Sequence, residues 1–246
     1  MKFVGVIPAR YKSSRFPGKP LANICGKPMI WWVYQQCLKV KELEAIYVAT
    51  DSEVIFEKCK ELNLEVIMTS DNPTGSDRVA EAAEHIEAQY FINIQGDEPI
   101  IEPEMIRQVI RLFDDPTVYF ATLKKEITDP YIINSINTVK VVTDINQDAM
   151  FFSRSIIPSN LKDGVLSKTY RHVGIYAYTK DFLCKFHHLD QTNLELGEGI
   201  EPLRALENGY KIRVGETCFD SIGVDIPNHI LDVEKIIKER TSNEKR

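Results

Sequence analysis

A loop near the start of the sequence concentrates cationic side chains. The apolar stretch 3–7 leads directly into it, and ten residues then carry four cations: Arg10, Lys12, Arg15 and Lys19. Forked guanidinium groups and ammonium groups on a backbone stiffened by prolines suit a polyanion such as a nucleoside triphosphate. The alternative is a solvated basic turn. We favour the anion site, because the whole chain is acidic, with 30 Lys and Arg against 36 Asp and Glu.

The loop lacks the two common glycine-rich phosphate-binding motifs. Gly18-Lys19 is followed by Pro20 where a Walker loop needs Ser or Thr, and no GxGxxG spacing follows the first strand. The loop must therefore use side chains in place of a glycine nest. We expect Arg10 and Arg15 to hold phosphate oxygens bidentately and Lys19 to supply a point charge.

Two acidic positions could bind a metal ion. Asp97, in Gln95-Gly96-Asp97-Glu98-Pro99, follows an apolar strand, and a carboxylate at a strand end suits Mg²⁺ shared with substrate phosphates. The alternative is that these residues only form a turn before a proline. Asp225 precedes a predicted helix, and its position alone favours a helix N-cap over a second metal ligand.

Two further segments have both a structural and a functional interpretation. Hydroxyls and backbone N–H groups of the loop at Thr74, Gly75, Ser76 and Arg78 could hold a base or a phosphate at a helix N-terminus, or could form a plain cap with an exposed arginine. In the second half, Arg154 ends an aromatic strand and could meet an acidic substrate. His172 enters an apolar strand, where a lone histidine is more often structural.

The elements that must position these residues alternate in the first half. Apolar runs predict strands at residues 3–7, 45–50, 65–69 and 90–95, and apolar residues at helical spacing predict helices at 28–40, 52–62 and 76–87. Pro28 suits a first helical position, and Ser52 and Ser76 suit N-caps. Such alternation predicts βαβ units and a parallel sheet.

The second half has a different pattern. We predict strands at 117–124, 138–143, 149–154, 173–178 and 212–217, a hairpin turn at 144–148, an exposed loop at 159–170, and helices at 179–188, 201–208 and 227–240. Gly209 suits the position after a helix. The fold class is therefore α/β, with a mixed, mostly parallel nucleotide-binding sheet and a partly antiparallel insertion.

Composition excludes several classes of protein. A net charge of −6 argues against a nucleic-acid partner, and no apolar run approaches the ~20 residues that span a bilayer. The N-terminus enters a strand directly, so we expect no signal peptide. The five cysteines are odd in number and scattered without a CxxC pair, which indicates reduced, mostly buried thiols in a cytoplasmic protein.

Taken together, the motifs resemble a known family. IPARYKSSRFPGKPL, VATD, TGSDR, NIQGDEP, VKVV, FFSR, RHVGIYAY, LRALENGYKI and GVDIP occur in the order typical of 3-deoxy-manno-octulosonate (Kdo) cytidylyltransferases. The resemblance covers essentially the whole chain. It implies a Rossmann-like, nucleotide-diphospho-sugar transferase-like fold in one domain, with a nucleotide-binding core at about 1–125 and 205–246 and a sugar-binding and dimerisation part at about 126–204.

The resemblance also implies an activity and its partners. Family members make CMP-Kdo from CTP and Kdo with release of pyrophosphate, require Mg²⁺ and are typically cytoplasmic homodimers that serve lipopolysaccharide or capsule synthesis. The matching positions imply nucleotide contacts, metal ligands and acidic-sugar contacts. Nucleotide contacts fall on Pro8, Ala9, Arg10, Arg15, Lys19, Thr74, Gly75, Ser76, Arg78, Gln95 and Asp97, metal ligands on Asp97 and Asp225, and sugar contacts on Arg154, His172, Tyr176, Glu198 and Glu201. Arg10, Lys19, Asp97 and Asp225 would carry catalysis.

One departure from the family concerns the sugar side. The family usually has LEQLR where this chain has Gly199-Ile200-Glu201-Pro202-Leu203-Arg204, and Pro202 replaces a side-chain amide and moves the helix start to its own position. Gly197 and Gly199 should loosen the segment before it. Acceptors such as 8-amino-Kdo or another ulosonic acid therefore stay open. An NAD-dependent oxidoreductase is disfavoured by the missing glycine fingerprint, and a catalytically silent nucleotide-binding subunit by the retained cations and aspartates.

Overall fold

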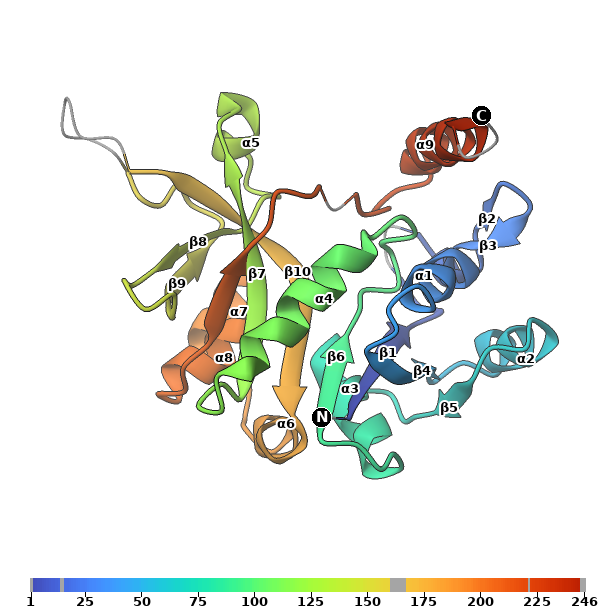
Figure 1. Cartoon of the computed structure of the whole chain (residues 1–246), viewed down its shortest axis with the longest axis horizontal. Helices are drawn as coiled ribbons and strands as arrows, with labels where there is room; N and C mark the ends of the chain where they lie inside the picture. Colours follow the sequence, from blue (N-terminus) through green and yellow to red (C-terminus); the bar gives the residue numbers. More distant parts are fainter. Residues whose placement is uncertain (1, 14–15, 160–166, 221, 244–246) are drawn as a thin grey trace. The chain divides into compact units, whose positions relative to one another are not determined.

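The apolar stretch before the cationic loop forms the central strand of a parallel sheet. In the computed structural model, which describes residues 2–13, 16–159, 167–220 and 222–243, this strand is β1 (Phe3–Ala9) (Figure 1). It pairs in parallel with β4 (Leu43–Thr50) and β6 (Tyr90–Asn93), and β4 pairs in parallel with β5 (Val66–Met68). The order β6-β1-β4-β5 confirms the parallel sheet predicted from the alternating pattern.

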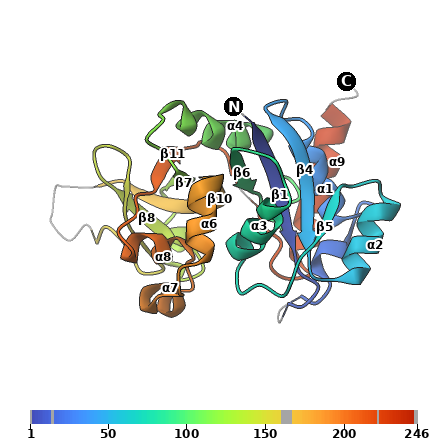
Figure 2. The ribbon, with the colours of Figure 1, turned by 90° about the horizontal axis from the view of Figure 1, so that it is seen from below.

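Three helices connect these strands. They are α1 (Met29–Cys37), α2 (Glu53–Glu61) and α3 (Gly75–Glu84). Right-handed crossovers place α1 and α2 on one face of the sheet and α3, which returns across it, on the other; Figure 2 shows α1 and α3 on opposite sides of β1. The N-cap of α3 is Thr74, whose hydroxyl accepts the Asp77 N–H at 3.1 Å, so the prediction of Ser76 as the cap was wrong.

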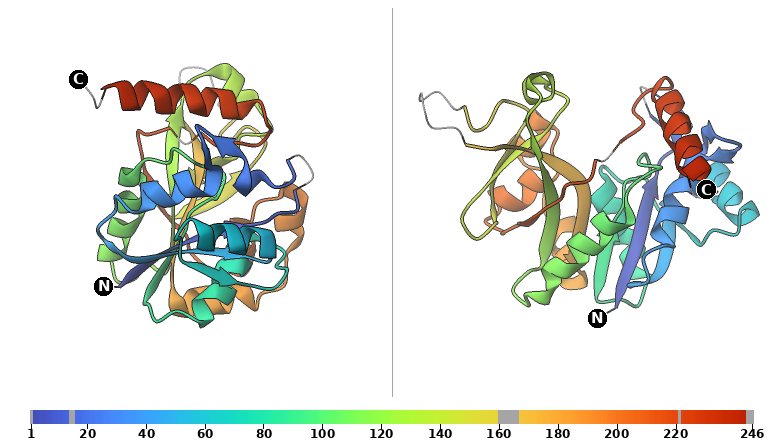
Figure 3. Two further views of the ribbon diagram at one scale, coloured as in Figure 1. Left: turned by 90° about the vertical axis from the view of Figure 1, so that its right-hand side faces the viewer. Right: turned by 45° about the horizontal axis from the view of Figure 1, so that its top comes forward.

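The end of the chain completes the core of this region. Helix α9 (His229–Asn243) lies beside the small hairpin of β2 (Asn23–Ile24) and β3 (Lys27–Pro28) (Figure 3). One cluster of buried side chains joins the two ends of the sequence: Ile24, Met29, Ile100, Val224, Val233 and Ile237. Residues Met1–Ile106 and Asp220–Arg246 together form one compact unit, here called unit 1.

Unit 2, Arg107–Phe219, contains a second set of strands. They are β7 (Phe120–Ile127), β8 (Lys140–Thr143), β9 (Ala149–Ser153), β10 (Thr169–Thr179) and β11 (Arg213–Glu216). β7 pairs in parallel with β11 and antiparallel with β10, and β8 pairs antiparallel with β10 and β9, which confirms a partly antiparallel arrangement. Unit 2 starts before the expected boundary at about 125 and ends after the expected boundary at about 205. Strand β7, which contains residue 125, pairs with β11, which follows residue 205, so both strands belong to this unit.

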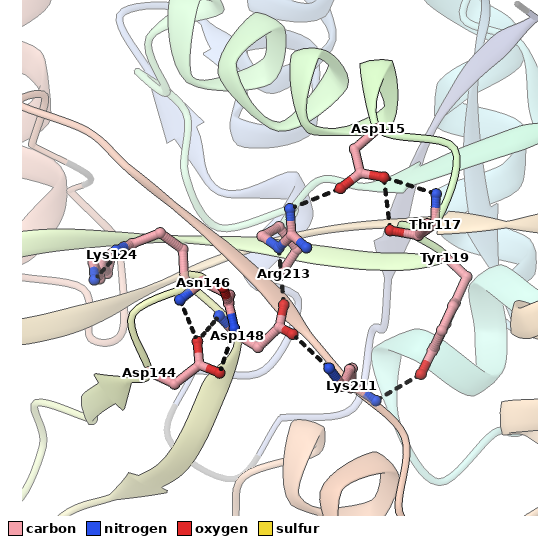
Figure 4. A network of polar contacts seen from close by, with 10 residues as sticks. Asp115, Thr117, Tyr119, Lys124, Asp144, Asn146, Asp148, Lys211 and Arg213 are labelled. Carbon is pink, nitrogen blue, oxygen red and sulfur yellow. Dashed lines mark hydrogen bonds and ion pairs between the residues drawn. The ribbon is translucent and has the colours of Figure 1, made fainter.

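The predicted hairpin turn at 144–148 is confirmed and is tied to β11 by ion pairs (Figure 4). The Asp144 carboxylate accepts the backbone N–H groups of Asn146 at 2.8 Å and Asp148 at 2.9 Å, which closes the turn. The Asp148 carboxylate then accepts from the Arg213 guanidinium at 2.8 Å, and Arg213 also reaches Asp115 at 3.2 Å. The turn is therefore held at its base while its tip residue, Ile145, stays exposed.

Several short elements were not foreseen. They are the helices α4 (Pro103–Arg111), α5 (Pro130–Asn134) and α7 (Asn193–Glu198) and the 3-10 turns Lys19–Leu21 and Leu112–Asp114. α6 (Lys180–His187), α8 (Pro202–Glu207) and α9 match predictions. Residues 160–166 of the predicted loop lie outside the described residues, while Thr169 and Tyr170 belong to β10.

Two findings bear on the classes of protein considered above. Only Cys37 and Cys59 of the five free cysteines are buried, and Cys218 is exposed, so the expectation of mostly buried thiols was wrong. Within the described part of the chain, no helix has the length and hydropathy to cross a membrane.

Candidate functional site

A cationic pocket lies at the carboxyl end of β1. Its volume is about 310 Å³, and it is lined by Pro8, Arg10, Lys12, Ser13, Lys19, Pro20, Gln95, Gly96 and Asp97. Among the residues that the structure describes, three cations and one carboxylate thus line the pocket. A parallel sheet binds ligands at this edge of its strands, and the charge balance selects a polyanion.

The loop after β1 is folded so that Lys19 faces Asp97. The Gly18 N–H donates to the Tyr11 carbonyl at 2.8 Å, and Gly18, at φ 68°, adopts the left-handed conformation that starts the 3-10 turn Lys19–Leu21. The Lys19 ammonium then lies 2.5 Å from the Asp97 carboxylate. A cation of the loop and the acidic residue after β6 therefore meet, although 78 residues separate them.

Gly96 permits this approach of the two loops. A Cβ atom added there would lie 2.8 Å from the Pro8 carbonyl oxygen, closer than real side chains come to backbone. The Glu98 N–H donates to the Gln95 carbonyl at 3.2 Å, so the segment forms a turn before Pro99, as the alternative to a metal site predicted. The same turn presents Asp97 to the pocket, and the two interpretations are compatible.

The segment that carries Asp225 lies next to Asp97. The Val224 N–H donates to the Asp97 carbonyl at 2.8 Å, and Asp225 itself is exposed. Helix α9 starts only at His229, so Asp225 is not its N-cap. In the described part of the chain, no group of three or more His, Cys, Asp and Glu is arranged to hold a metal ion. A divalent ion at Asp97 and Asp225 would need further oxygen ligands from a substrate, which is the usual pattern for Mg²⁺.

Hydrogen bonds connect the start of α3 to Gln95. The buried Asn93 side chain donates to the Ser76 hydroxyl at 3.4 Å and accepts from the Gln95 amide at 3.4 Å. The Thr74 hydroxyl, already the cap of α3, donates to the Asp77 carboxylate at 2.6 Å. Ser76 and Gln95, both predicted nucleotide contacts from separate motifs, are therefore brought together by one side chain.

Arg78 is fully buried, which corrects the alternative of an exposed arginine. One guanidinium nitrogen donates to the Thr69 hydroxyl at 2.5 Å and the Ser70 carbonyl at 3.1 Å, and another lies 3.4 Å from Asp51. Burial lowers the pKa of Arg78, Asp51 raises it, and repulsion from Arg10 lowers it further. Arg78 therefore ties the start of α3 to the ends of β4 and β5, and its direct contact with a nucleotide stays a prediction.

In unit 2, the side chain of Glu198 holds Arg154 in place. Its carboxylate accepts from the Ser153 hydroxyl at 3.1 Å and from the Arg154 N–H at 2.9 Å, and its carbonyl accepts from the Arg154 guanidinium at 2.6 Å. A further guanidinium nitrogen donates to the Ile136 carbonyl at 3.0 Å. Glu198 therefore supports Arg154, and its direct contact with a sugar stays a prediction.

A buried lysine organises the same place. Lys140 on β8 is 0% exposed, and its ammonium donates to the carbonyls of Ser135 at 2.8 Å, Thr138 at 2.8 Å and Arg154 at 2.7 Å. These three bonds use all its donors. Desolvation lowers the pKa of Lys140, and the neighbouring Arg154 charge lowers it further. Lys140 therefore fixes the backbone on either side of it, and of the two cations only the partly exposed Arg154 can meet an anionic ligand.

His172 and Tyr176 lie together on β10, with ring centroids 5.4 Å apart. His172 Nε2 is 3.0 Å from the Thr122 hydroxyl on β7, and burial lowers the pKa of His172 to about 3. Glu201 is the N-cap of α8 and Pro202 its first residue, which confirms the predicted helix start. Gly197 lies inside α7 and Gly199 ends it at φ 64°, and the loosening expected from these two glycines stays a prediction.

The structure sorts the predicted residues into two groups. Pro8, Arg10, Lys19, Gln95 and Asp97 line one pocket, and the acidic-sugar candidates all belong to unit 2. Ala9 is buried in β1, Gly75 starts α3, and Arg15 lies outside the described residues. The roles of Ser13, Gly96, Thr122 and Lys140 were missed. For Lys140 the sequence holds a signal, because a lysine within the apolar run Val139–Val142 indicates a buried cation.

Comparisons with known sequences agree on one family. The sequence model described as Cytidylyltransferase matches residues 4–212. The 3-deoxy-manno-octulosonate cytidylyltransferase of Geobacter metallireducens is 45% identical, with 97% of this chain and 98% of that protein covered. The protein of the same description from Bacteroides thetaiotaomicron is 44% identical, over 98% of this chain and all of its own length.

Solved structures give the same result at the level of the fold. CMP:2-keto-3-deoxy-manno-octonic acid synthetase complexed with CTP superposes with a TM-score of 0.92 at 39% identity, covering 98% of this chain and 100% of that one. The 4-diphosphocytidyl-2C-methyl-D-erythritol synthase of Anaerococcus prevotii superposes with a TM-score of 0.61 at 14% identity, which indicates a shared fold alone.

Proposed function

The chain belongs to the cytidylyltransferase family, and on that premise we propose that it transfers the cytidylyl group of CTP to Kdo, forming CMP-Kdo and pyrophosphate. The observation that carries the proposal is the pocket at the end of β1, where Arg10, Lys12 and Lys19 face a single carboxylate. A triphosphate is the common cellular anion that needs so many cations, and Asn93 holds Ser76 and Gln95 together at the same edge of the sheet.

The reaction is a displacement at the α-phosphorus of CTP. The anomeric hydroxyl oxygen of the acceptor forms the new bond to phosphorus, the bond to the β-phosphate oxygen breaks, pyrophosphate leaves, and the hydroxyl proton is released to solvent. Negative charge grows on the leaving group, so Arg10 and Lys19 stabilise the transition state more than the ground state. The carboxylate of Asp97 holds the Lys19 ammonium in position for this task.

We propose that Asp97 and Asp225 hold Mg²⁺ when substrates are bound. Their oxygens are the hard ligands that Mg²⁺ prefers, and the bond between the Val224 N–H and the Asp97 carbonyl brings the two segments together. The Asp97 carboxylate already faces a cation, the Lys19 ammonium, which shows that it is oriented toward positive charge. When bound, the ion would supply charge neutralisation at the α-phosphate.

The acceptor is proposed to bind through unit 2. Arg154 is the candidate for the sugar carboxylate, because its partly exposed guanidinium is set by Glu198 and by the Ile136 carbonyl, and its backbone is held by the buried Lys140. His172 and Tyr176 offer polar atoms to hydroxyls, and Glu201 begins α8 beside the segment that carries Glu198. The product would serve lipopolysaccharide or capsule synthesis.

We further propose a homodimer that works in the cytoplasm. Strand β9 pairs only with β8 among the strands that the structure describes. Its first residue, Ala149, also donates its N–H to the Ile212 carbonyl, so the edge available to a second copy is the part of β9 beyond Ala149. Large apolar side chains are exposed on the same unit: Tyr131, Ile136, Ile145 and Met150. The free cysteines fit a reducing compartment. Sedimentation analysis of the wild type and Met150→Lys tests this: a dimer that Met150→Lys dissociates supports the edge contact, and a wild-type monomer refutes it.

The direct test of function measures pyrophosphate release. The protein is mixed with CTP, Kdo and Mg²⁺, and formation of CMP-Kdo is followed by mass spectrometry. Stoichiometric pyrophosphate and CMP-Kdo support the proposal, and no turnover at any CTP concentration overturns it. Omitting Mg²⁺ and adding a chelator tests the metal: turnover that persists without divalent ions would refute the role given to Asp97 and Asp225.

An acceptor panel defines the sugar. Kdo, 8-amino-Kdo and a nonulosonic acid are compared by kcat/KM at saturating CTP. We expect Kdo to have the highest value, because the curated relatives that match nearly the whole chain are described as Kdo enzymes. A higher value for 8-amino-Kdo would assign Pro202 and the start of α8 to a changed pocket.

A further inference from the structure

A single hydroxyl lies at an irregular point in the pairing of β7 with β10. The register between these strands shifts between Val173 and Tyr176, so two residues of β10 bulge from the ladder opposite Thr122. The Thr122 side chain is 0% exposed, and its oxygen lies 3.1 Å from the Val173 carbonyl, 2.7 Å from the Ile175 carbonyl and 3.0 Å from His172 Nε2. Three polar atoms thus surround one hydroxyl group.

Counting hydrogens assigns the direction of each bond. A hydroxyl has one hydrogen to donate, and a carbonyl oxygen can only accept. If the Thr122 hydrogen pointed at His172, its oxygen would face the Ile175 carbonyl oxygen at 2.7 Å with no hydrogen between them, which is repulsive. The hydroxyl must therefore donate to a carbonyl of the bulge and accept from His172. His172 then carries its hydrogen on Nε2.

The rest of the His172 environment keeps the ring neutral and fixed. Its backbone N–H donates to the Val139 carbonyl at 2.8 Å, and the ring packs edge-on against Phe152 with centroids 5.0 Å apart. Burial, and then repulsion from Arg171, lowers the pKa of the imidazole to about 3. A neutral imidazole with hydrogen on Nε2 has a lone pair on Nδ1.

We infer that Thr122 is a positioning residue that holds His172 in the Nε2–H tautomer, so that Nδ1 accepts a hydrogen bond from a hydroxyl of the acceptor sugar. The inference rests on the proposed function, which makes a polyhydroxylated acid the ligand of unit 2. An acceptor atom at this place selects a hydroxyl or ammonium donor over a carbonyl or ether oxygen. The role of Thr122 is to prevent the ring from presenting N–H to the sugar.

The first test reads the tautomer in the wild-type enzyme. Two-dimensional ¹H–¹⁵N correlation through the ring carbons distinguishes Nε2–H from Nδ1–H, and loss of one spin system in His172→Asn assigns the signal. We expect the Nε2–H pattern, unchanged between pH 6 and 8. A Nδ1–H pattern, or a charged ring, overturns the inference even if the enzyme makes CMP-Kdo.

The second test removes the hydroxyl. Thr122→Val keeps the shape of the side chain, and we expect the KM for Kdo to rise about tenfold while the KM for CTP stays within about twofold. Thr122→Ser restores the hydroxyl and should restore the KM. Equal rises in both KM values, or no difference between the Val and Ser variants, would assign Thr122 a structural role only. If Thr122→Val does not fold, the wild-type spectrum and Thr122→Ser decide the matter.

The third test separates the two ring nitrogens. His172→Asn places an amide oxygen close to the position of Nδ1, whereas His172→Gln places its amide close to that of Nε2. If Nδ1 receives the sugar hydroxyl, the Asn variant retains a lower KM for Kdo than the Gln variant. The reverse order overturns the inference. Failure of the wild type to use Kdo with CTP at all would instead refute the proposed function, and it would leave the tautomer result standing.

Discussion

The polar groups of the two units are held in opposite ways. In unit 1, Arg10 and Lys12 line the pocket, and no hydrogen bond joins either side chain to another residue that the structure describes. In unit 2, Arg154 and Lys140 are bound by backbone carbonyls on several sides, and His172 is fixed by Thr122. The loop after β1 keeps Arg10 and Lys12 available, although Lys19 of the same loop pairs with Asp97, and unit 2 fixes Arg154, Lys140 and His172 in advance.

The difference follows from what each region is proposed to bind. A triphosphate is flexible and highly charged, so cations on long side chains can adjust to it, and charge matters more than exact geometry. A sugar acid presents one carboxylate and several hydroxyls of fixed stereochemistry, which demands donors and acceptors at set positions. Substitutions in unit 1 should therefore change turnover with little loss of stability, and substitutions in unit 2 should change both.

Asp97→Asn should give the largest effect. The amide can neither pair with the Lys19 ammonium nor bind a divalent ion as a carboxylate does, so we expect kcat to fall about 10³-fold or more. The thermal midpoint should stay within a few degrees of the wild type. Steady-state kinetics and calorimetry check this, with Asp232→Asn, an exposed acid on α9, as the control. Near-wild-type turnover would show that Asp97 has no role in the reaction.

Lys19→Met should give the next largest effect and should fall on the nucleotide. We expect kcat/KM for CTP to drop about 10²-fold, because a cation at the leaving phosphates is lost, with little change in the KM for Kdo. Lys27→Met removes an exposed cation of β3 in the same unit and should have little effect. If kcat/KM fell for Kdo and stayed unchanged for CTP, the assignment of unit 1 to the nucleotide would be wrong.

Lys140→Met tests the opposite expectation for unit 2. Three carbonyls lose their donor at a buried place, so we expect the free energy of unfolding to fall by about 3 kcal/mol, and the KM for Kdo to rise because the Arg154 backbone is released. Lys168→Met, which breaks an exposed ion pair with Glu126, should leave the free energy of unfolding nearly unchanged. Denaturant titration compares the two variants, and equal losses would refute the special role of Lys140.

The smallest expected effect is a dependence of stability on pH through His172. Its pKa in the folded protein, about 3, lies below the usual 6.5, so the unfolded state binds the proton more readily. The stabilisation that the neutral His172 ring contributes is complete above pH 6.5. As the pH falls from 6.5 toward 3, the free energy of unfolding decreases by about 1 kcal/mol for each pH unit. Unfolding titrations at pH 7.5 and 5.0 should show a smaller decline in His172→Gln than in the wild type. Equal declines would contradict a neutral, fixed ring.

Much of unit 1 could be predicted from the sequence, because each strand and helix has its own local signal. β1, β4 and β6 are apolar runs, and α2 follows a break at Ser52. Helix α4 was missed although Met105, Ile106, Val109 and Ile110 have helical spacing. The segment before it, with Pro99 and Pro103 on either side of two isoleucines, is typical of a loop, and the helix starts only at the second of these prolines, Pro103.

The site could be predicted only as a set of residue types. The cations near β1 and the acid after β6 were recognisable, because parallel strands end at one edge. Their pairing, Lys19 with Asp97, depends on the approach that Gly96 allows, and no local pattern encodes it. Likewise, no sequence pattern around Glu198 indicates that its carboxylate accepts the backbone N–H of Arg154. Contacts of this kind depend on the packing of distant segments.

The return of the chain to unit 1 has a consequence for biosynthesis. Unit 2 is continuous, whereas unit 1 waits for residues 220–246, which bring Asp225 and the apolar side chains of α9 to the cluster around Ile24 and Met29. These residues are synthesised after the whole of unit 2. A nascent chain that stops short of them lacks the carboxylate proposed to hold Mg²⁺ and part of a core, so unit 1 can complete its folding only after unit 2 has been made.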